Sequence, residues 1–261
     1  KIFILDLDGT VSIGKTPVKG AKRIIRFLLR NRKKVVFLTN NTSMTNESHK
    51  YRIKKMLKIN EGEIHIYGAL DALVKYLRKN RVSKIYALLN HEVREYLSKR
   101  GFKQSKNPQL VVIGFDTSLN YNRLKHACML IQRGIPWVLA NPDVRCPVEE
   151  GYMPDAGSIG LLVEKVTGKV PIAVLGKPHP EMLLDVIQAF DATKDDACFF
   201  GDRLYTDVKM GADVGVLTIL LLTGEASFKD FMDIESTKAS FLLGENWVFL
   251  YEAFKKLLRA R

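Results

Sequence analysis

The sequence predicts an α/β protein in which helices cover parallel sheets. Apolar runs of strand length, such as residues 35–38 and 110–115, alternate with amphipathic stretches at helical spacing. These runs lack the polar alternation of half-exposed strands, which is typical of strands buried on both faces. Polar residues follow several runs directly, at the end of the strand where open α/β sheets bind ligands.

The first strand is predicted over residues 3–5 and ends in two acids. Residues 3–10 read Phe-Ile-Leu-Asp-Leu-Asp-Gly-Thr, so Asp6 and Asp8 would share one face of an ideal strand. Two carboxylates there can hold a divalent cation, attack an electrophile and transfer a proton. The alternative is a strand that simply runs into an Asp-Gly turn.

A second strand over residues 35–38 is predicted to lie beside the first. An amphipathic helix over residues 21–29 connects them into a βαβ unit with a right-handed crossover. The second strand runs into five polar residues, which would therefore lie next to Asp6 and Asp8. They are Thr39, Asn40, Asn41, Thr42 and Ser43.

This polar run has two interpretations. Its side chains and backbone N–H groups are suited to hold phosphate oxygens. Alternatively, it is only a loop that caps the following helix through Ser43 or Thr45.

Residues 68–171 are predicted to form a second α/β unit with its own sheet. Strands are expected at residues 85–89, 110–115 and 136–140, and none ends in a pair of acids. The segment 141–157 is rich in turn-forming residues. We interpret it as a loop that faces the substrate, or else as a connection without function.

The chain is then expected to return to the first sheet with a strand over residues 172–175. Lys177 follows, between Gly176 and Pro178; this is no P-loop, because Pro171 and Pro178 break that pattern. A lysine fixed in this way can point its ammonium at the site. The alternative is an exposed lysine.

Another strand over residues 197–200 precedes Asp202, which occupies the position that Asp6 occupies after the first strand. Asp207 falls in the first turn of the next helix, where a carboxylate also favours the positive end of the helix dipole. A further strand is expected over residues 216–222, and an amphipathic helix runs from Trp247 to Leu258.

Composition limits the function classes. The chain of 261 residues has a formal net charge of +13, but its basic residues fall between apolar helix positions, which is typical of solvated faces. No apolar run approaches the roughly 20 residues of a membrane span, and acids interrupt the first apolar segment, so we expect neither membrane insertion nor a secretory leader. The cysteines are odd in number, far apart and without a CxxC pair, which predicts a cytoplasmic protein without zinc or disulfides. They are Cys128, Cys146 and Cys198.

Four motifs at predicted strand ends resemble the signatures of haloacid-dehalogenase-like phosphatases. The resemblance covers the whole chain and is to the branch with a large α/β cap, which includes para-nitrophenyl, pyridoxal phosphate and phosphoglycolate phosphatases. It implies a Rossmann-like doubly wound parallel sheet core, residues 1–67 and 172–261, with an inserted α/β cap domain, residues 68–171. The motifs are Asp6-x-Asp8-Gly9-Thr10, Leu38-Thr39-Asn40-Asn41, Gly176-Lys177-Pro178 and Gly201-Asp202-Arg203-x-x-Thr206-Asp207.

The resemblance also implies roles. Asp6 would be the nucleophile that forms an aspartyl-phosphate, and Asp8 the general acid and then the base. Mg²⁺ would be held by Asp6, the backbone carbonyl of Asp8 and Asp202, and Asp207 would support these ligands. The transferring phosphoryl group would be bound by Thr39, Asn40, Asn41 and Lys177. An anionic nucleophile needs such cations to approach a phosphate.

The cap loop departs from its relatives. Several relatives have a His where this chain has Arg145-Cys146-Pro147, and often Pro-Gly-x-Gly in place of residues 154–157. Asp143, Arg145 and Cys146 are expected to form a substrate-specificity loop. Arg145 is suited to meet a second anionic group of the substrate, unless it is merely one more basic surface residue.

The expected partner is a small phosphorylated metabolite, and a homodimer through the cap is also considered. One alternative is a phosphometabolite-binding protein with reduced catalysis, against which the joint presence of Asp6, Asp8, Lys177 and Asp202 argues. Another is a nucleic-acid-directed phosphatase. Nucleic acid is the less expected ligand, because a site that must close under a cap excludes long polymers.

Overall fold

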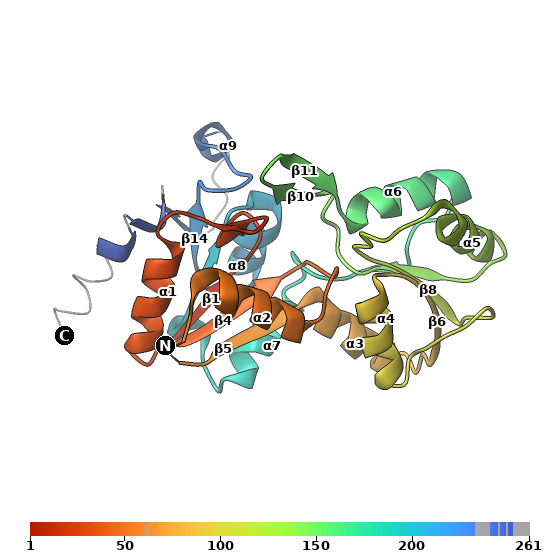
Figure 1. Ribbon diagram of the computed structural model, residues 1–261, viewed down its shortest axis with the longest axis horizontal. Helices are drawn as coiled ribbons and strands as arrows, with labels where there is room; N and C mark the ends of the chain where they lie inside the picture. Colours follow the sequence, from red (N-terminus) through yellow and green to blue (C-terminus); the bar gives the residue numbers. More distant parts are fainter. Residues whose placement is uncertain (61, 233–240, 245, 249, 253–261) are drawn as a thin grey trace.

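The computed structural model describes residues 1–60, 62–232, 241–244, 246–248 and 250–252. Two lobes lie side by side along the longest axis, and the chain passes from the first to the second and back again (Figure 1). Each lobe is built on its own parallel sheet, as the sequence predicts.

The first sheet has six parallel strands in the order β15-β14-β13-β1-β4-β5. The strands expected near residues 3–5, 35–38, 197–200 and 216–222 are confirmed. Two strands, β5 and β15, were not predicted. The strands are β1 (Ile2–Leu5), β4 (Lys34–Thr39), β5 (Ile64–Gly68), β13 (Ala197–Gly201), β14 (Leu217–Leu221) and β15 (Phe241–Gly244).

Helices cover both faces of this sheet because the strand side chains alternate. Phe3 and Leu5 pack with α1 and α2, whereas Ile2 and Ile4 pack with α7 and α8 on the opposite face. Both clusters are buried, which confirms a doubly wound arrangement. The helices are α1 (Ala21–Arg30), α2 (Asn46–Leu57), α7 (Glu181–Ala189) and α8 (Lys209–Val214).

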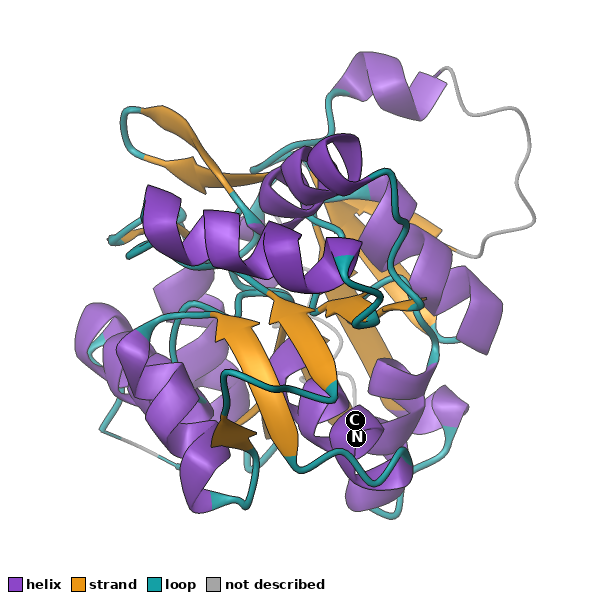
Figure 2. Ribbon diagram, turned by 90° about the vertical axis from the view of Figure 1, so that its right-hand side faces the viewer, coloured by secondary structure: helices purple, strands orange, loops and turns teal. Residues whose placement is uncertain are grey.

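The second sheet has five parallel strands in the order β12-β9-β8-β6-β7, also flanked by helices (Figure 2). The strand expected to return to the first sheet is β12, but it pairs with β9 here, so that prediction is wrong. The elements are β6 (Lys84–Leu88), β7 (Lys103–Gln104), β8 (Leu110–Ile113), β9 (Trp137–Leu139), β12 (Ala173–Val174), α3 (Ala69–Lys79), α4 (His91–Lys99), α5 (Tyr121–Gln132) and α6 (Ala156–Thr167).

The segment 141–157, expected as an irregular loop, contains an antiparallel hairpin. This hairpin reaches from the second lobe toward the first, where a smaller hairpin meets it. Glu149 at its turn accepts hydrogen bonds from Lys15 N at 2.7 Å and Thr16 Oγ1 at 3.2 Å. The hairpins are β10 (Arg145–Val148) with β11 (Gly151–Pro154), and β2 (Ser12–Ile13) with β3 (Thr16–Pro17).

Other elements are short: a 3₁₀ turn (Lys194–Asp196), a π-helical turn (Leu204–Val208) and α9 (Phe228–Met232). Of the predicted closing helix, Trp247 and Leu250 are buried against the first sheet, and Phe254 and Leu258 lie outside the described residues. Among the described helices, none has both the length and the apolar character needed to cross a membrane.

Candidate active site

Two neighbouring strands place three aspartates together at the carboxyl edge of the first sheet. Asp6 follows β1, and Asp202 follows β13, which pairs with β1 in parallel. The backbone N–H of Asp6 donates to Phe200 O at 2.8 Å and so fixes the two strand ends side by side. One carboxylate oxygen each of Asp6, Asp202 and Asp207 lies within 4.8 Å of the others.

The backbone at Gly9 closes tightly over this cluster. Gly9 has a φ of 104°, and a Cβ at this position would lie 2.3 Å from Asp202 Oδ2. Only glycine satisfies both conditions. The Asp-Gly pair of the first motif is therefore a packing requirement of the acid cluster as well as a turn signal.

Lys177 is buried and points its ammonium into the cluster. Its Nζ contacts Asp6 Oδ1 and lies 2.7 Å from Asp207 Oδ1. Burial alone would lower the pKa of Lys177, but Asp207 and Asp6 raise it above its ordinary value, so the ammonium stays charged. The expectation of a lysine aimed at the site is confirmed over that of an exposed lysine.

Asp207 has both roles that the sequence allowed, one at the start of a helical turn and one beside the acid cluster. Its Oδ1 accepts from Lys177, and its Oδ2 accepts from the backbone N–H groups of Asp202 and Arg203 at 3.2 Å each. It therefore caps the start of the π-helical turn and holds the lysine beside Asp6 at the same time.

The cluster carries more negative charge than its protein partners neutralise. Thr10 Oγ1 lies 3.0 Å from Asp6 Oδ2 and 2.8 Å from Asp202 Oδ1, yet one hydroxyl hydrogen can serve only one of them. Burial raises the pKa of Asp6, and burial followed by the charges of Asp6 and Asp207 raises that of Asp202 well above its ordinary value. This buried, oxygen-only donor set fits a hard divalent cation such as Mg²⁺.

Asp8 has a different environment from Asp6. Asn41 Nδ2 donates to its Oδ2 at 3.2 Å, and Arg52 Nη2 lies 3.4 Å from its Oδ1. Burial would raise the pKa of Asp8, but Arg52, His49 and the Asn41 hydrogen bond together lower it. Arg52 was expected on a solvated helix face, which is wrong, because it pairs with this acid.

The polar run after β4 both caps a helix and lines the site. Thr45 Oγ1 accepts from Ser48 N at the start of α2. Thr39, Asn40 and Asn41 border the same cavity as Asp6 and Asp8. Asn40 is tied to the lysine loop, since its Oδ1 accepts from Lys177 N at 2.7 Å and its Nδ2 donates to Lys177 O at 3.2 Å.

The second lobe closes this cavity with Asp143, Cys146 and Asp155. Asp143 Oδ1 accepts from Asn40 Nδ2 at 3.1 Å, and its Oδ2 lies 2.6 Å from Arg203 Nη1. The cavity measures about 10 Å³, which is room for about one water molecule. A larger ligand can enter only when the lining residues move apart.

Arg145 is not among the described residues that border the cavity. Its side chain is 49% exposed, as the sequence predicts for a surface position. The guanidinium lies 3.1 Å from Glu225 Oε1 and 4.3 Å from the ring centre of Tyr152.

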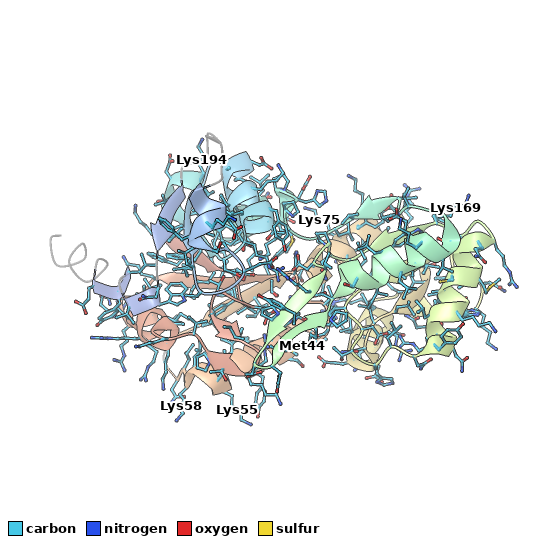
Figure 3. The ribbon with its side chains drawn as sticks, turned by 90° about the horizontal axis from the view of Figure 1, so that it is seen from above. Met44, Lys55, Lys58, Lys75, Lys169 and Lys194 are labelled. Atoms are coloured by element: carbon cyan, nitrogen blue, oxygen red, sulfur yellow. The ribbon has the colours of Figure 1, made fainter. Side chains whose placement is uncertain are left out.

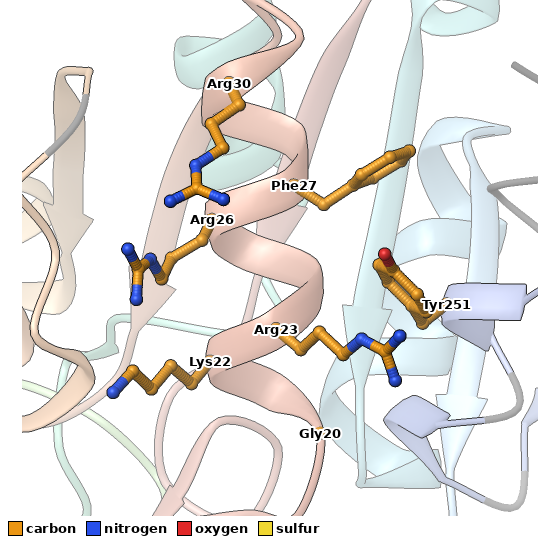
Figure 4. Close-up of a pocket in the computed structure, with 7 residues that line it drawn as sticks. All are labelled: Gly20, Lys22, Arg23, Arg26, Phe27, Arg30 and Tyr251. Carbon is orange, nitrogen blue, oxygen red and sulfur yellow. The ribbon is translucent and has the colours of Figure 1, made fainter.

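The basic surface lies apart from this cavity. Labelled lysines on both lobes, among them Lys58, Lys169 and Lys194, point outward in Figure 3. A separate pocket on α1 is lined by basic and aromatic side chains (Figure 4). It shares no residue with the acid-lined cavity. Its lining residues are Gly20, Lys22, Arg23, Arg26, Phe27, Arg30 and Tyr251.

Four residues of the site were given no role by the sequence alone. Thr10 and Arg203 stand within the motifs, so their positions were visible. Arg52 lies on α2 among other basic residues and gave no signal. Asp155 was noted only as a departure in the cap, although it borders the cavity.

Comparisons with known protein families support the geometry. Residues 3–103 match the family described as haloacid dehalogenase-like hydrolase, and residues 174–241 match the HAD-hydrolase-like family. The chain is 30% identical to an acid sugar phosphatase of Staphylococcus haemolyticus over 236 residues, 89% of each chain.

Solved structures show the same fold. A 4-nitrophenylphosphatase from Thermotoga maritima aligns with a TM-score of 0.83 and 32% identity over 94% of both chains. A glycerol phosphate phosphatase from Mycobacterium tuberculosis, solved in complex with magnesium, aligns with a TM-score of 0.82 over 94% of this chain and 75% of its own. At 24% identity, the second likeness concerns the fold alone.

Proposed function

Since this chain belongs to the haloacid dehalogenase-like hydrolases and is a phosphatase, we propose that it hydrolyses small phosphate monoesters with Mg²⁺ through an aspartyl-phosphate. The observation that carries the proposal is the buried cluster of Asp6, Asp202 and Asp207, with Lys177 between two of its members. A small phosphorylated metabolite in the cytoplasm is the proposed substrate.

Asp6 acts as the nucleophile. A carboxylate oxygen of Asp6 attacks phosphorus, the bond from phosphorus to the leaving oxygen breaks, and Asp8 gives that oxygen a proton. In the second step Asp8 takes a proton from water, the water oxygen attacks phosphorus, and inorganic phosphate leaves Asp6. One acid on each side of the reacting group suits these separate tasks.

The environment of Asp8 matches the second step. Its lowered pKa keeps it ionised in the closed state, ready to accept a proton from water. For the first step it must be protonated. The negative charge of an arriving phosphate ester raises the pKa of a neighbouring carboxylate, so substrate binding favours protonation of Asp8.

Asp6 and Asp202, with the backbone carbonyl of Asp8, would hold Mg²⁺, and Asp207 would support them. The cation supplies positive charge to the phosphoryl oxygens. Lys177 adds a fixed positive charge, and Thr39, Asn40 and Asn41 supply hydroxyl, amide and backbone donors from the loop after β4. Together these groups neutralise and position the transferring phosphoryl group.

The second lobe acts as the cap that sets substrate choice, through a loop that contains Asp143, Arg145 and Cys146. Arg203 links it to the first lobe, because its guanidinium pairs with Asp143 of the cap and lies 2.9 Å from Glu225 of the core. Closure excludes water from the reacting groups, and opening admits substrate.

The cap also offers a surface for a homodimer. Large apolar side chains are exposed along α6 and the segment that leads to β12, and β12 is an edge strand of its sheet. Light scattering on the purified protein tests this part of the proposal, and a monomer at micromolar concentration contradicts it. The exposed residues are Leu161, Leu162, Val166, Val170 and Ile172.

The reaction is tested with para-nitrophenyl phosphate at near-neutral pH. We expect hydrolysis that EDTA followed by gel filtration abolishes and that added Mg²⁺ restores. Zn²⁺ and Ca²⁺ at matched concentrations serve as controls for metal identity. Activity that survives complete metal removal contradicts the metal assignment.

A further inference from the structure

The wall that the cap presents to the acid cluster lacks an available cation. Four aspartates and one arginine border the cavity among the described residues. The arginine, Arg203, is already held: its Nη1 lies 2.6 Å from Asp143, its Nε 2.9 Å from Glu225, and its Nη2 donates to Arg145 O at 3.0 Å. Removing one partner from a buried ion pair is costly, so Arg203 is not free to bind a second anion.

Arg145 does not supply that cation either. Its guanidinium is paired with Glu225 and rests on the ring of Tyr152, outside the cavity lining. Among the described residues, the cap wall therefore has no free cation for a second anionic group.

Asp155 is the acceptor that remains on this wall. Both oxygens of Asp143 are engaged, by Asn40 and by Arg203. Asp155 is only 4% exposed, and its Oδ1 accepts from Ala156 N at the start of α6. From the described residues, no hydrogen bond reaches its Oδ2. Burial and then the charge of Asp143 raise the pKa of Asp155 well above its ordinary value.

The position of Asp8 identifies which side of the cavity receives the leaving group. A proton donor to the leaving oxygen must lie within hydrogen-bond reach of that oxygen. Asp8, Cys146 and Asp155 border one small cavity, so a group that departs beside Asp8 lies close to the two cap residues.

We propose that Asp155 is a specificity-determining residue that accepts a hydrogen bond from the leaving group. This phosphatase then favours esters whose leaving group carries a hydroxyl or another hydrogen-bond donor near the ester oxygen. It disfavours esters with a second anion there, because unpaired like charges oppose binding. The inference rests on the proposed function and adds the class of leaving group to it.

A matched pair of substrates tests this inference. 2-Hydroxyethyl phosphate carries a hydroxymethyl group where 2-phosphoglycolate carries a carboxylate, and the two esters are otherwise identical. para-Nitrophenyl phosphate serves as the reference. For the wild type, we expect kcat/KM to be at least about tenfold higher for the hydroxyl ester. In Asp155→Asn the ratio falls at least about fivefold, because an amide also donates to a carboxylate.

Asp155→Ser is the second variant, and Asn and Ser both preserve the N-cap of α6. Asp195→Asn, at an exposed acid of the first lobe, makes the same chemical change away from the cavity and should keep the wild-type ratio. A wild type that takes the carboxylate ester equally well, or an unchanged ratio in both Asp155 variants, overturns the inference while hydrolysis of para-nitrophenyl phosphate upholds the proposed function. No hydrolysis of any of the three esters with Mg²⁺ overturns both.

Discussion

Buried acids follow strands of both parallel sheets, and the acids after β1 and β13 differ from the acid after β8 in how their charge is balanced. In the second sheet, Asp116 follows β8 and lies 2.7 Å from Arg123, one acid against one cation. In the first sheet, three carboxylates lie together, and the ammonium of Lys177 pairs with two of them, Asp6 and Asp207. The same architecture thus places one acid with its own cation after β8, and more acids than paired cations after β1 and β13.

The two groups of acids are therefore expected to affect different properties, the stability of the fold in one case and catalysis in the other. Asp116 and Arg123 balance each other's charge, so removal of one of them should lower the free energy of unfolding. The acids at the first sheet are expected to be balanced by a bound cation and to act on a substrate. Removal of one of them should therefore lower kcat.

Asp6→Asn should lower kcat for para-nitrophenyl phosphate by at least about 10³-fold, because an amide is not a nucleophile toward phosphorus. The fold should survive, since the change removes a buried charge that repels Asp207 and Asp202. Circular dichroism and thermal unfolding check this point. An active Asp6→Asn protein would contradict the nucleophile role, and an unfolded one would mean that Asp6 is structural.

Asp116→Asn should produce the opposite pattern. The change leaves Arg123 without its carboxylate partner and should cost about 2–4 kcal/mol of the free energy of unfolding, a range lowered because Arg123 is partly exposed. Urea unfolding provides the measurement. A stability equal to that of the wild type would show that the ion pair at this edge is not needed.

Within the first lobe, the buried His49 is expected to make the free energy of unfolding depend on pH. Burial, then Arg52, lowers the pKa of His49 to about 4, whereas in the unfolded chain it titrates near 6.5. The unfolded state therefore binds the extra proton first, and stability is lost as pH falls from about 6.5 to 4, by on the order of 3 kcal/mol.

Asp6 and Asp202 have raised pKa values and act in the opposite direction, since their stabilising contribution grows as pH falls. The comparison of wild type with His49→Gln removes this shared background. Between pH 7 and pH 4, we expect the free energy of unfolding of the wild type to fall more than that of the variant. A difference that does not depend on pH would contradict the buried neutral state of His49.

The smallest effect is expected at Arg145, whose ion pair with Glu225 is half exposed. Arg145→Ala should change kcat/KM by less than about fivefold on any monoester, the range of a surface ion pair of up to about 1 kcal/mol. Steady-state kinetics on the hydroxyl and carboxylate esters check it. A large selective loss on the carboxylate ester would restore the expectation that Arg145 binds a second anion.

The catalytic edge was predictable because it depends on local signals. Asp6 and Asp202 each lie at the end of an apolar run, and the ends of neighbouring parallel strands must meet. The same logic could not assign β12, which has only two residues and whose sheet is decided by pairing with β9. It also missed β5, where His65 and Tyr67 interrupt the apolar pattern.

Contacts made by long side chains were beyond sequence reasoning. Arg52 lies on a helix with many basic residues, and only the packing of α2 brings its guanidinium to Asp8. Asp155 and Arg203 were visible in the sequence, but their positions depend on how the cap closes over the core. The division at residues 67/68 and 171/172, and the role of each site residue, remain predictions.

In the proposed mechanism, Asp6 carries the phosphoryl group during turnover. Its most direct test is rapid acid quenching of the wild type during hydrolysis of para-nitrophenyl phosphate with Mg²⁺, followed by mass spectrometry of the protein and its peptides. We predict a mass gain of one phosphoryl group, located at Asp6 and absent from Asp6→Asn. Steady turnover without any such adduct, or an adduct on another residue, would contradict the account.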